Sequence, residues 1–102
     1  MIFELIIIYG RRRIGKTALY LQATKKYKRI YFLATEENNL ERFYNVCIRH
    51  FPEVSKLRKD YEVIFEFLKD KVDVIIIDEF QNMIQENKNT VSTFQASIYN
   101  FS

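Results

Sequence analysis

Eight residues near the N-terminus have the composition and spacing of a phosphate-binding loop. They read Gly10-Arg11-Arg12-Arg13-Ile14-Gly15-Lys16-Thr17 and match the pattern G-x-x-x-x-G-K-S/T at every defined position. In such a loop, successive backbone N–H groups line a concave anion site, and the following helix adds the positive end of its dipole. We expect Lys16 to reach the β- and γ-phosphates of a nucleotide and the Thr17 hydroxyl to ligate Mg²⁺. Residues 10–17 and Ala18 are the predicted nucleotide-binding segment.

The other positions of this loop have more general roles. Gly10 and Gly15 are the two glycines of the chain, and we expect both to use backbone angles that are closed to other residues. Arg11, Arg12 and Arg13 fill variable positions, where they add positive field near the phosphates. A direct contact of one arginine with nucleotide, nucleic acid or a neighbouring subunit is the alternative.

A second group of chemically capable residues ends an apolar run, Ile75-Ile76-Ile77-Asp78-Glu79. Ligands of open parallel sheets bind beyond the carboxyl ends of the strands, so both acids are predicted to face the loop. Asp78 suits the binding of Mg²⁺. Glu79 suits the removal of a proton from an attacking water, which favours hydrolysis. Lys16 and Glu79 are thus the predicted catalytic residues, and Thr17 and Asp78 the predicted metal ligands.

The elements that must position these residues alternate along the chain. Apolar runs predict strands over residues 5–9, 29–34 and 72–79, the first of them buried on both faces. Helical spacing predicts helices over 16–27, 40–51 and 60–70 and in the C-terminal tail, and in the first of these Ala18, Leu19, Ala23 and Tyr27 form the apolar stripe. The order β-α-β-α-α-β-α predicts an α/β fold, a parallel sheet with helices on both faces.

Length, net charge and hydrophobicity limit the kind of protein that this chain can be. With 102 residues, one small domain is expected, and a net charge of +3 is too small to imply nucleic acid by itself. The apolar N-terminal run contains Glu4 and is too short to span a bilayer, so a cytoplasmic protein without membrane contact is expected.

Cys47 is predicted to pack in the core, and His50 to lie at the surface or core edge. Gln81 and Asn82 are expected to cap the next helix, with a contact to nucleotide as the alternative.

Three segments together resemble a known family. The segments "IIIYGRRRIGKTAL", "VDVIIIDEFQNMI" and "YFLATEENNLERF" are similar to the archaeal ATPase family within the STAND-type, AAA-related P-loop ATPases. The resemblance implies a P-loop NTPase-like three-layer sandwich that uses ATP and Mg²⁺. It implies a Walker A motif over residues 10–17 and a Walker B motif over 74–79, which ends in the acid pair. A DNA-related role or a regulatory protein partner is a further implication.

The resemblance covers only the first part of the family's domain, so residues 1–102 are interpreted as a partial P-loop ATPase domain. In the family, a sensor strand separates the two motif strands. Here either these strands pair directly or a gap stays open between them. The sequence leaves three functions open. The first is an ATPase, and the second is a nucleotide-binding fragment that does not hydrolyse ATP. The third is a basic nucleic-acid-binding module built on residues 11–13 with Lys25, Lys26 and Lys28.

Overall fold

The structure, a computed structural model, describes residues 3–10 and 14–101, with the backbone alone for residues 14 and 96–101. In this part of the chain the centre is a parallel sheet of β1 (Glu4–Ile7), β2 (Arg29–Leu33) and β3 (Val74–Asp78), in the order β1-β3-β2. Ile76 of β3 lies between Ile6 of β1 and Tyr31 of β2. The strand before the loop therefore pairs directly with the strand that carries the acids.

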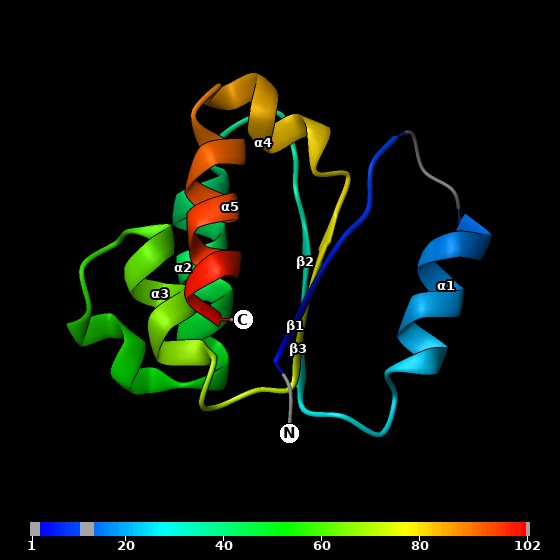
Figure 1. The fold of residues 1–102 in the computed structure, drawn as a ribbon, viewed down its shortest axis with the longest axis horizontal. Helices are drawn as coiled ribbons and strands as arrows, with labels where there is room; N and C mark the ends of the chain where they lie inside the picture. The colour runs from blue at the N-terminus through cyan, green and yellow to red at the C-terminus, as the bar shows by residue number, and fades with distance from the viewer. Residues whose placement is uncertain (1–2, 11–13, 102) are drawn as a thin grey trace.

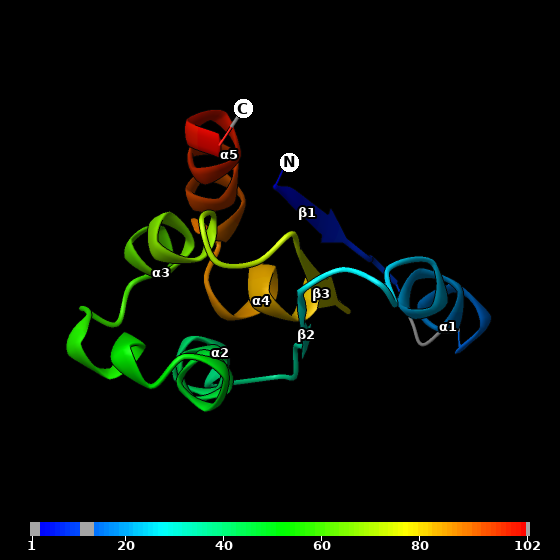
Figure 2. The same cartoon turned by 90° about the horizontal axis from the view of Figure 1, so that it is seen from below.

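Helices cover both faces of this sheet (Figure 1). One face carries α1 (Ile14–Ala23), and the other carries α2 (Asn39–His50), α3 (Tyr61–Leu68) and α5 (Thr90–Phe101), a separation that Figure 2 also shows. A short helix, α4 (Gln81–Glu86), follows β3, and the 3₁₀ helix η1 (Pro52–Lys56) joins α2 to α3. The predicted α/β class is confirmed. The helices α4 and η1 were not in the predicted order, because they are too short to show a helical period.

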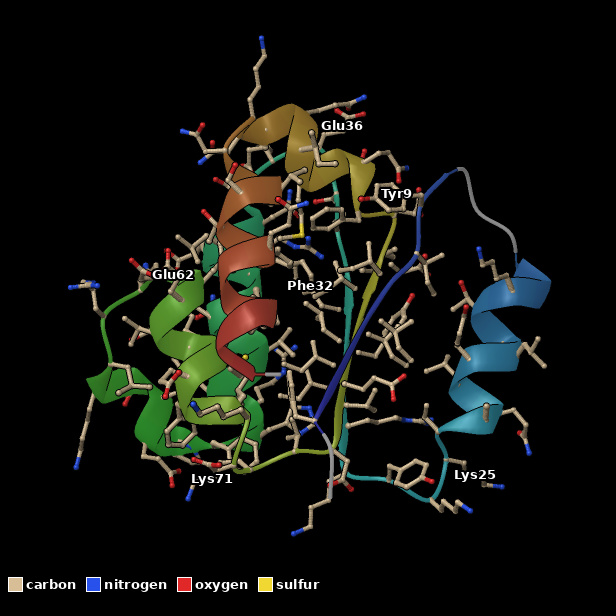
Figure 3. The ribbon with its side chains drawn as sticks, in the orientation of Figure 1. Tyr9, Lys25, Phe32, Glu36, Glu62 and Lys71 are labelled. Carbon is tan, nitrogen blue, oxygen red and sulfur yellow. The ribbon has the colours of Figure 1, made fainter. Side chains whose placement is uncertain are left out.

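The main core fills the space between the sheet and the group of α2, α3 and α5. Every residue of β3 is buried. Phe32 of β2 points from the sheet toward these helices (Figure 3), and its ring centroid lies 5.4 Å from that of Phe43 on α2. The rings of Phe65 and Phe94 meet edge to face at 4.9 Å, which joins α3 to α5. Within the described part of the chain, none of the helices combines the length and apolarity needed to cross a membrane.

Cys47 and His50 lie on α2 as the sequence predicts. Cys47 is fully buried, and burial raises the pKa of its thiol to about 12. The thiol is therefore protonated at neutral pH and acts as a small packing group rather than a nucleophile. His50 is exposed at the end of the helix.

The predicted burial of the first strand is wrong. β1 is an edge strand, so only one of its edges is paired, and Leu5, Ile6 and Ile7 are each half-buried. The continuous apolar run that predicts burial on both faces describes β3, the central strand, correctly.

The predicted apolar stripe of the first helix is also wrong. Leu19 is 68% exposed, and Ala18, Ala23 and Tyr27 are exposed as well, with Tyr27 lying beyond the end of α1. The residues that face the sheet include Thr17 and Leu21, which line a pocket against it. The helix is thus rotated away from the orientation that hydrophobicity alone predicts.

Candidate functional site

The phosphate-binding loop and the acid pair meet at one end of the sheet. The hydroxyl of Thr17, in the first turn of α1, donates a hydrogen bond of 2.8 Å to Oδ2 of Asp78, the last residue of β3. Asp78 is only 7% exposed, so bulk water competes little for this contact. The predicted meeting of the two motifs beyond the carboxyl ends of the strands is thus seen in the structure.

Backbone pairing beyond the strand ends sets this geometry. The N–H of Ile8 donates to the carbonyl of Ile77, and the N–H of Phe80 donates to the carbonyl of Ile8, both at 2.9 Å. The ring of Tyr9 (Figure 3) stands edge-on to that of Phe80, with centroids 5.5 Å apart. The segments that follow β1 and β3 are therefore held together where the loop and the acids begin.

The structure describes the two ends of the phosphate-binding loop. Gly10 has a φ of 90°, which other residues rarely adopt, as expected. Gly15 already belongs to α1 and has no positive φ, so the expectation of special backbone angles is wrong there. Residues 11–13 lie outside the described part of the chain, and their predicted roles stay predictions. Ile14 is the first residue of α1.

The beginning of α1 suits an anion. The N–H groups of a first helical turn have no intrahelical acceptor, and this turn contains no acidic residue. Lys16 is exposed and makes no hydrogen bond or ion pair with residues 3–10 or 14–101. Its ammonium group is therefore available to a phosphate. Ala18 lines a pocket beside the acids.

Three hydrogen bonds fix the carboxylate of Asp78. Besides the bond from Thr17, the Tyr31 hydroxyl donates to Oδ2 at 2.7 Å, and the N–H of Glu79 donates to Oδ1 at 2.9 Å. Tyr31 is a residue of this site that the sequence motifs do not include. A signal does exist in the alternation of β2, because Tyr31 must face away from the side on which Phe32 is buried.

Glu79 combines an unusual backbone with an available carboxylate. Its φ of 52° lies in the left-handed region, which costs an ordinary residue about 1 kcal/mol or more. Such strain persists only where surrounding contacts impose it, and it concentrates at functional positions. The side chain lines a pocket of about 280 Å³ between α1 and the sheet, together with Thr17, Ala18, Leu21, Tyr31, Leu33 and Asp78.

The predicted capping roles of Gln81 and Asn82 are wrong. The N-cap of α4 is Phe80, and no side-chain capping bond forms there. Gln81 instead exchanges two hydrogen bonds with Gly10: its Oε1 accepts from the Gly10 N–H at 3.0 Å, and its Nε2 donates to the Gly10 carbonyl at 3.3 Å. Asn82 donates from Nδ2 to the carbonyl of Ala34, just beyond β2, at 3.1 Å.

The oxygen atoms at this site fit a hard divalent cation. Mg²⁺ binds through one or two protein oxygens and completes its shell with water and phosphate oxygens. The Thr17 hydroxyl and the Asp78 carboxylate supply such oxygens in mutual contact. In residues 3–10 and 14–101, no group of three or more His, Cys, Asp and Glu side chains could hold a metal ion. An ion at this site would therefore depend on nucleotide and water for its other ligands.

A larger pocket, of about 480 Å³, lies between α2, α3, α4 and α5. Most of its acidic side chains are engaged in the fold. Glu86 accepts hydrogen bonds from the N–H groups of Asn38 and Asn39 at the start of α2, and Asp60 caps α3 through the N–H groups of Glu62 and Val63. This pocket is therefore a junction of helix ends, and the smaller pocket beside Asp78 is the better candidate for chemistry.

Fold and site together define the class of protein. A parallel α/β domain in which a loop of this pattern and an acid pair converge beyond the strands is the arrangement of P-loop nucleotide-binding proteins. Residues 3–98 match the AAA domain family, and the chain belongs to that family.

The chain is also similar to an uncharacterized protein of Methanocaldococcus jannaschii. The two are 50% identical over 93 residues, which cover 91% of this chain and 21% of that protein. The chain thus spans about a fifth of the length of this relative. No solved structure matches it.

Proposed function

We propose that this chain binds ATP with Mg²⁺ at the junction of the phosphate-binding loop and the acid pair. The observation that carries the proposal is the 2.8 Å hydrogen bond between the Thr17 hydroxyl and the Asp78 carboxylate, since P-loop proteins hold Mg²⁺ with these two groups. Membership of the AAA domain family supports nucleotide use in general. We assign the chain more narrowly to the archaeal ATPases on its motif resemblance, with which an archaeal relative agrees.

Each residue of the site has a distinct role in this proposal. Lys16 pairs with the β- and γ-phosphates, and the first-turn N–H groups of α1 face the same anion. Thr17 and Asp78 hold Mg²⁺, which neutralises phosphate charge when it is bound. Glu79 accepts a proton from a water whose oxygen bonds to the γ-phosphorus, while the bond from that phosphorus to ADP breaks. The products are ADP and inorganic phosphate.

The nucleic-acid alternative has less support. Lys25 lies in the turn after α1, at the end of the sheet opposite Tyr9 (Figure 3). Lys25, Lys26 and Lys28 are therefore remote from Gly10 and Ile14, which flank the three arginines. A DNA or regulatory protein partner and a cytoplasmic location stay predictions.

Titration of the purified chain with ATP tests the proposal. We expect saturable binding that is tighter with Mg²⁺ than with EDTA, because the site holds the ion and the phosphates together. ATP at a hundred times its Kd should stabilise the fold by about 2.7 kcal/mol, measurable as a rise in Tm. A folded chain, verified by circular dichroism, that shows neither saturable binding nor a Tm shift would contradict the proposal.

The change Tyr31→Phe should weaken the effect of Mg²⁺ without abolishing ATP binding. It removes the hydroxyl group that donates a hydrogen bond to Oδ2 of Asp78 and keeps the ring. The loss of such a supporting contact lowers metal affinity about 10- to 100-fold. The Mg²⁺ concentration that half-saturates the enhancement of ATP binding should rise accordingly. Binding in EDTA should stay the same.

Tyr44→Phe is the matched control for this change. It also removes a hydrogen-bonded tyrosine hydroxyl. That hydroxyl donates to the carbonyls of Ser55 and Leu57, away from the site. If both variants shift the Mg²⁺ requirement equally, the effect comes from a general loss of stability, and the role given to Tyr31 is wrong.

A further inference from the structure

We propose that Gln81 is a positioning residue that holds the start of the phosphate-binding loop in register with the acid pair. The inference rests on the proposed function and extends it to a residue outside both motifs. Gln81 is the first residue of α4, and its partner, Gly10, is the first residue of the loop. The two lie 71 positions apart in the chain.

The side chain of Gln81 extends the hydrogen bonding between the segments that follow β1 and β3 beyond the last backbone hydrogen bond. The last backbone hydrogen bonds between the segments that follow β1 and β3 are made by Ile8. Its N–H donates to the carbonyl of Ile77, and its carbonyl accepts from the N–H of Phe80. At Glu79 the positive φ turns the chain out of the strand direction and into α4. Two residues beyond Ile8, the amide of Gln81 accepts from the Gly10 N–H at 3.0 Å and donates to the Gly10 carbonyl at 3.3 Å. It serves both backbone polar groups of Gly10, as a paired strand would.

Gly10 depends on this contact for its orientation. Its φ of 90° is one of several backbone conformations open to glycine. Gly10 is exposed, and a Cβ atom built on it would meet no described atom within 4 Å apart from its chain neighbours. Among the described residues, the two bonds from Gln81 are the ones that hold its N–H and carbonyl.

The chemistry of the contact requires glutamine. The end of the side chain must present one acceptor and one donor together, which a primary amide does and a carboxylate does not. Asparagine offers the same amide on a side chain one methylene shorter. Because α1 anchors the other end of the loop, fixing Gly10 orders both ends before nucleotide arrives. Pre-ordering of this kind raises affinity by lowering the entropy lost on binding.

Gln81→Met tests the inference, with Gln85→Met as the matched control. Methionine keeps the length of the side chain and removes both hydrogen bonds. Gln85 is exposed on the same helix. Loss of two exposed hydrogen bonds should weaken ATP binding about tenfold in Gln81→Met and leave Gln85→Met like the wild type. The Tm of both variants without nucleotide should match the wild type within the scatter of the measurement.

Glycine labelling gives a second readout that needs no ATP. The chain has two glycines, so a ¹⁵N-glycine sample gives two amide resonances, and ¹³C-carbonyl tyrosine selects Gly10, which follows Tyr9. In Gln81→Met, we expect a shifted Gly10 resonance and an amide hydrogen that exchanges about tenfold faster, since it loses its acceptor. The Gly15 resonance should exchange as in the wild type.

The outcomes separate this inference from the proposed function. Unchanged Gly10 exchange, or unchanged ATP affinity despite faster exchange, overturns the positioning role while ATP binding by the wild type still stands. A wild-type chain that fails to bind ATP defeats the proposed function, and the positioning role falls with it even if Gln81 protects the Gly10 amide. Equal losses in Gln81→Met and Gln85→Met would point to α4 stability and also overturn the role.

Discussion

Replacing Lys16 with alanine is expected to weaken ATP binding about a hundredfold, because charge-assisted hydrogen bonds to phosphate contribute about 1.5–3 kcal/mol. The ammonium group of Lys16 is exposed and makes no contact with the described residues that its removal would break. The Tm of the chain without nucleotide should therefore stay the same. Isothermal titration with ATP and Mg²⁺, compared with the wild type, measures the effect.

Lys25→Ala is the control, because it makes the same change of net charge at the opposite end of the sheet. Equal affinity of Lys16→Ala and Lys25→Ala for ATP would show that general positive charge, and not the loop, binds the nucleotide. The same pair tests the nucleic-acid alternative. DNA binding that survives Lys16→Ala, is lost in Lys25→Ala and collapses with salt would support a basic module instead.

The sequence predicted the strands and the meeting of the motifs for a chemical reason. A loop that lines a phosphate with backbone N–H groups needs its glycines and its lysine at fixed spacing, and a central parallel strand needs an apolar run on both faces. Both constraints are local, so the sequence alone is enough to recognise Gly10, Lys16 and the apolar run that ends at Asp78. Parallel pairing then brings the loop and Asp78 to the same end of the sheet, which the Thr17 contact confirms.

The orientation of α1 shows where that reasoning fails. Hydrophobic spacing predicted Leu19 on the inner face, but Leu19 is 68% exposed. The loop fixes the start of the helix and directs Thr17 toward Asp78, and residues three or four positions apart share a helical face. Leu21 therefore turns inward with Thr17. The geometry of the site, rather than the apolar stripe, sets the rotation of this helix.

The partners of Tyr31 and Gln81 could not be predicted from their neighbours in the sequence, although the alternation of β2 indicates which face Tyr31 occupies. Tyr31 reaches Asp78 only because β2 and β3 are adjacent, and Gln81 reaches Gly10 only because β1 pairs directly with β3. Strand pairing is a long-range property, and the sequence left open whether the two motif strands pair directly or stay apart. For Gln81, helix capping was the sensible local interpretation, since polar side chains at a helix start often cap it.

The change Glu79→Gln is expected to lower the rate of ATP hydrolysis by about 10²- to 10⁴-fold while ATP binding survives. Glutamine keeps the size of the side chain but cannot accept the proton of the attacking water. Glu79 also has a positive φ, and its backbone N–H bonds Asp78, so a conservative replacement is needed to keep the turn. Release of inorganic phosphate under saturating ATP and Mg²⁺ measures turnover, and the titration used for Lys16 measures binding.

Glu36→Gln is the control for this change, because Glu36 is exposed in the segment after β2 and the substitution removes the same charge. Turnover should be lost in Glu79→Gln and kept in Glu36→Gln. If the wild type binds ATP without turnover, the chain is the nucleotide-binding fragment of the second hypothesis, and the strained backbone at Glu79 then serves to place Gln81 rather than a catalytic base. If Glu79→Gln hydrolyses ATP as fast as the wild type, another group takes the proton, and the assignment of Glu79 is wrong.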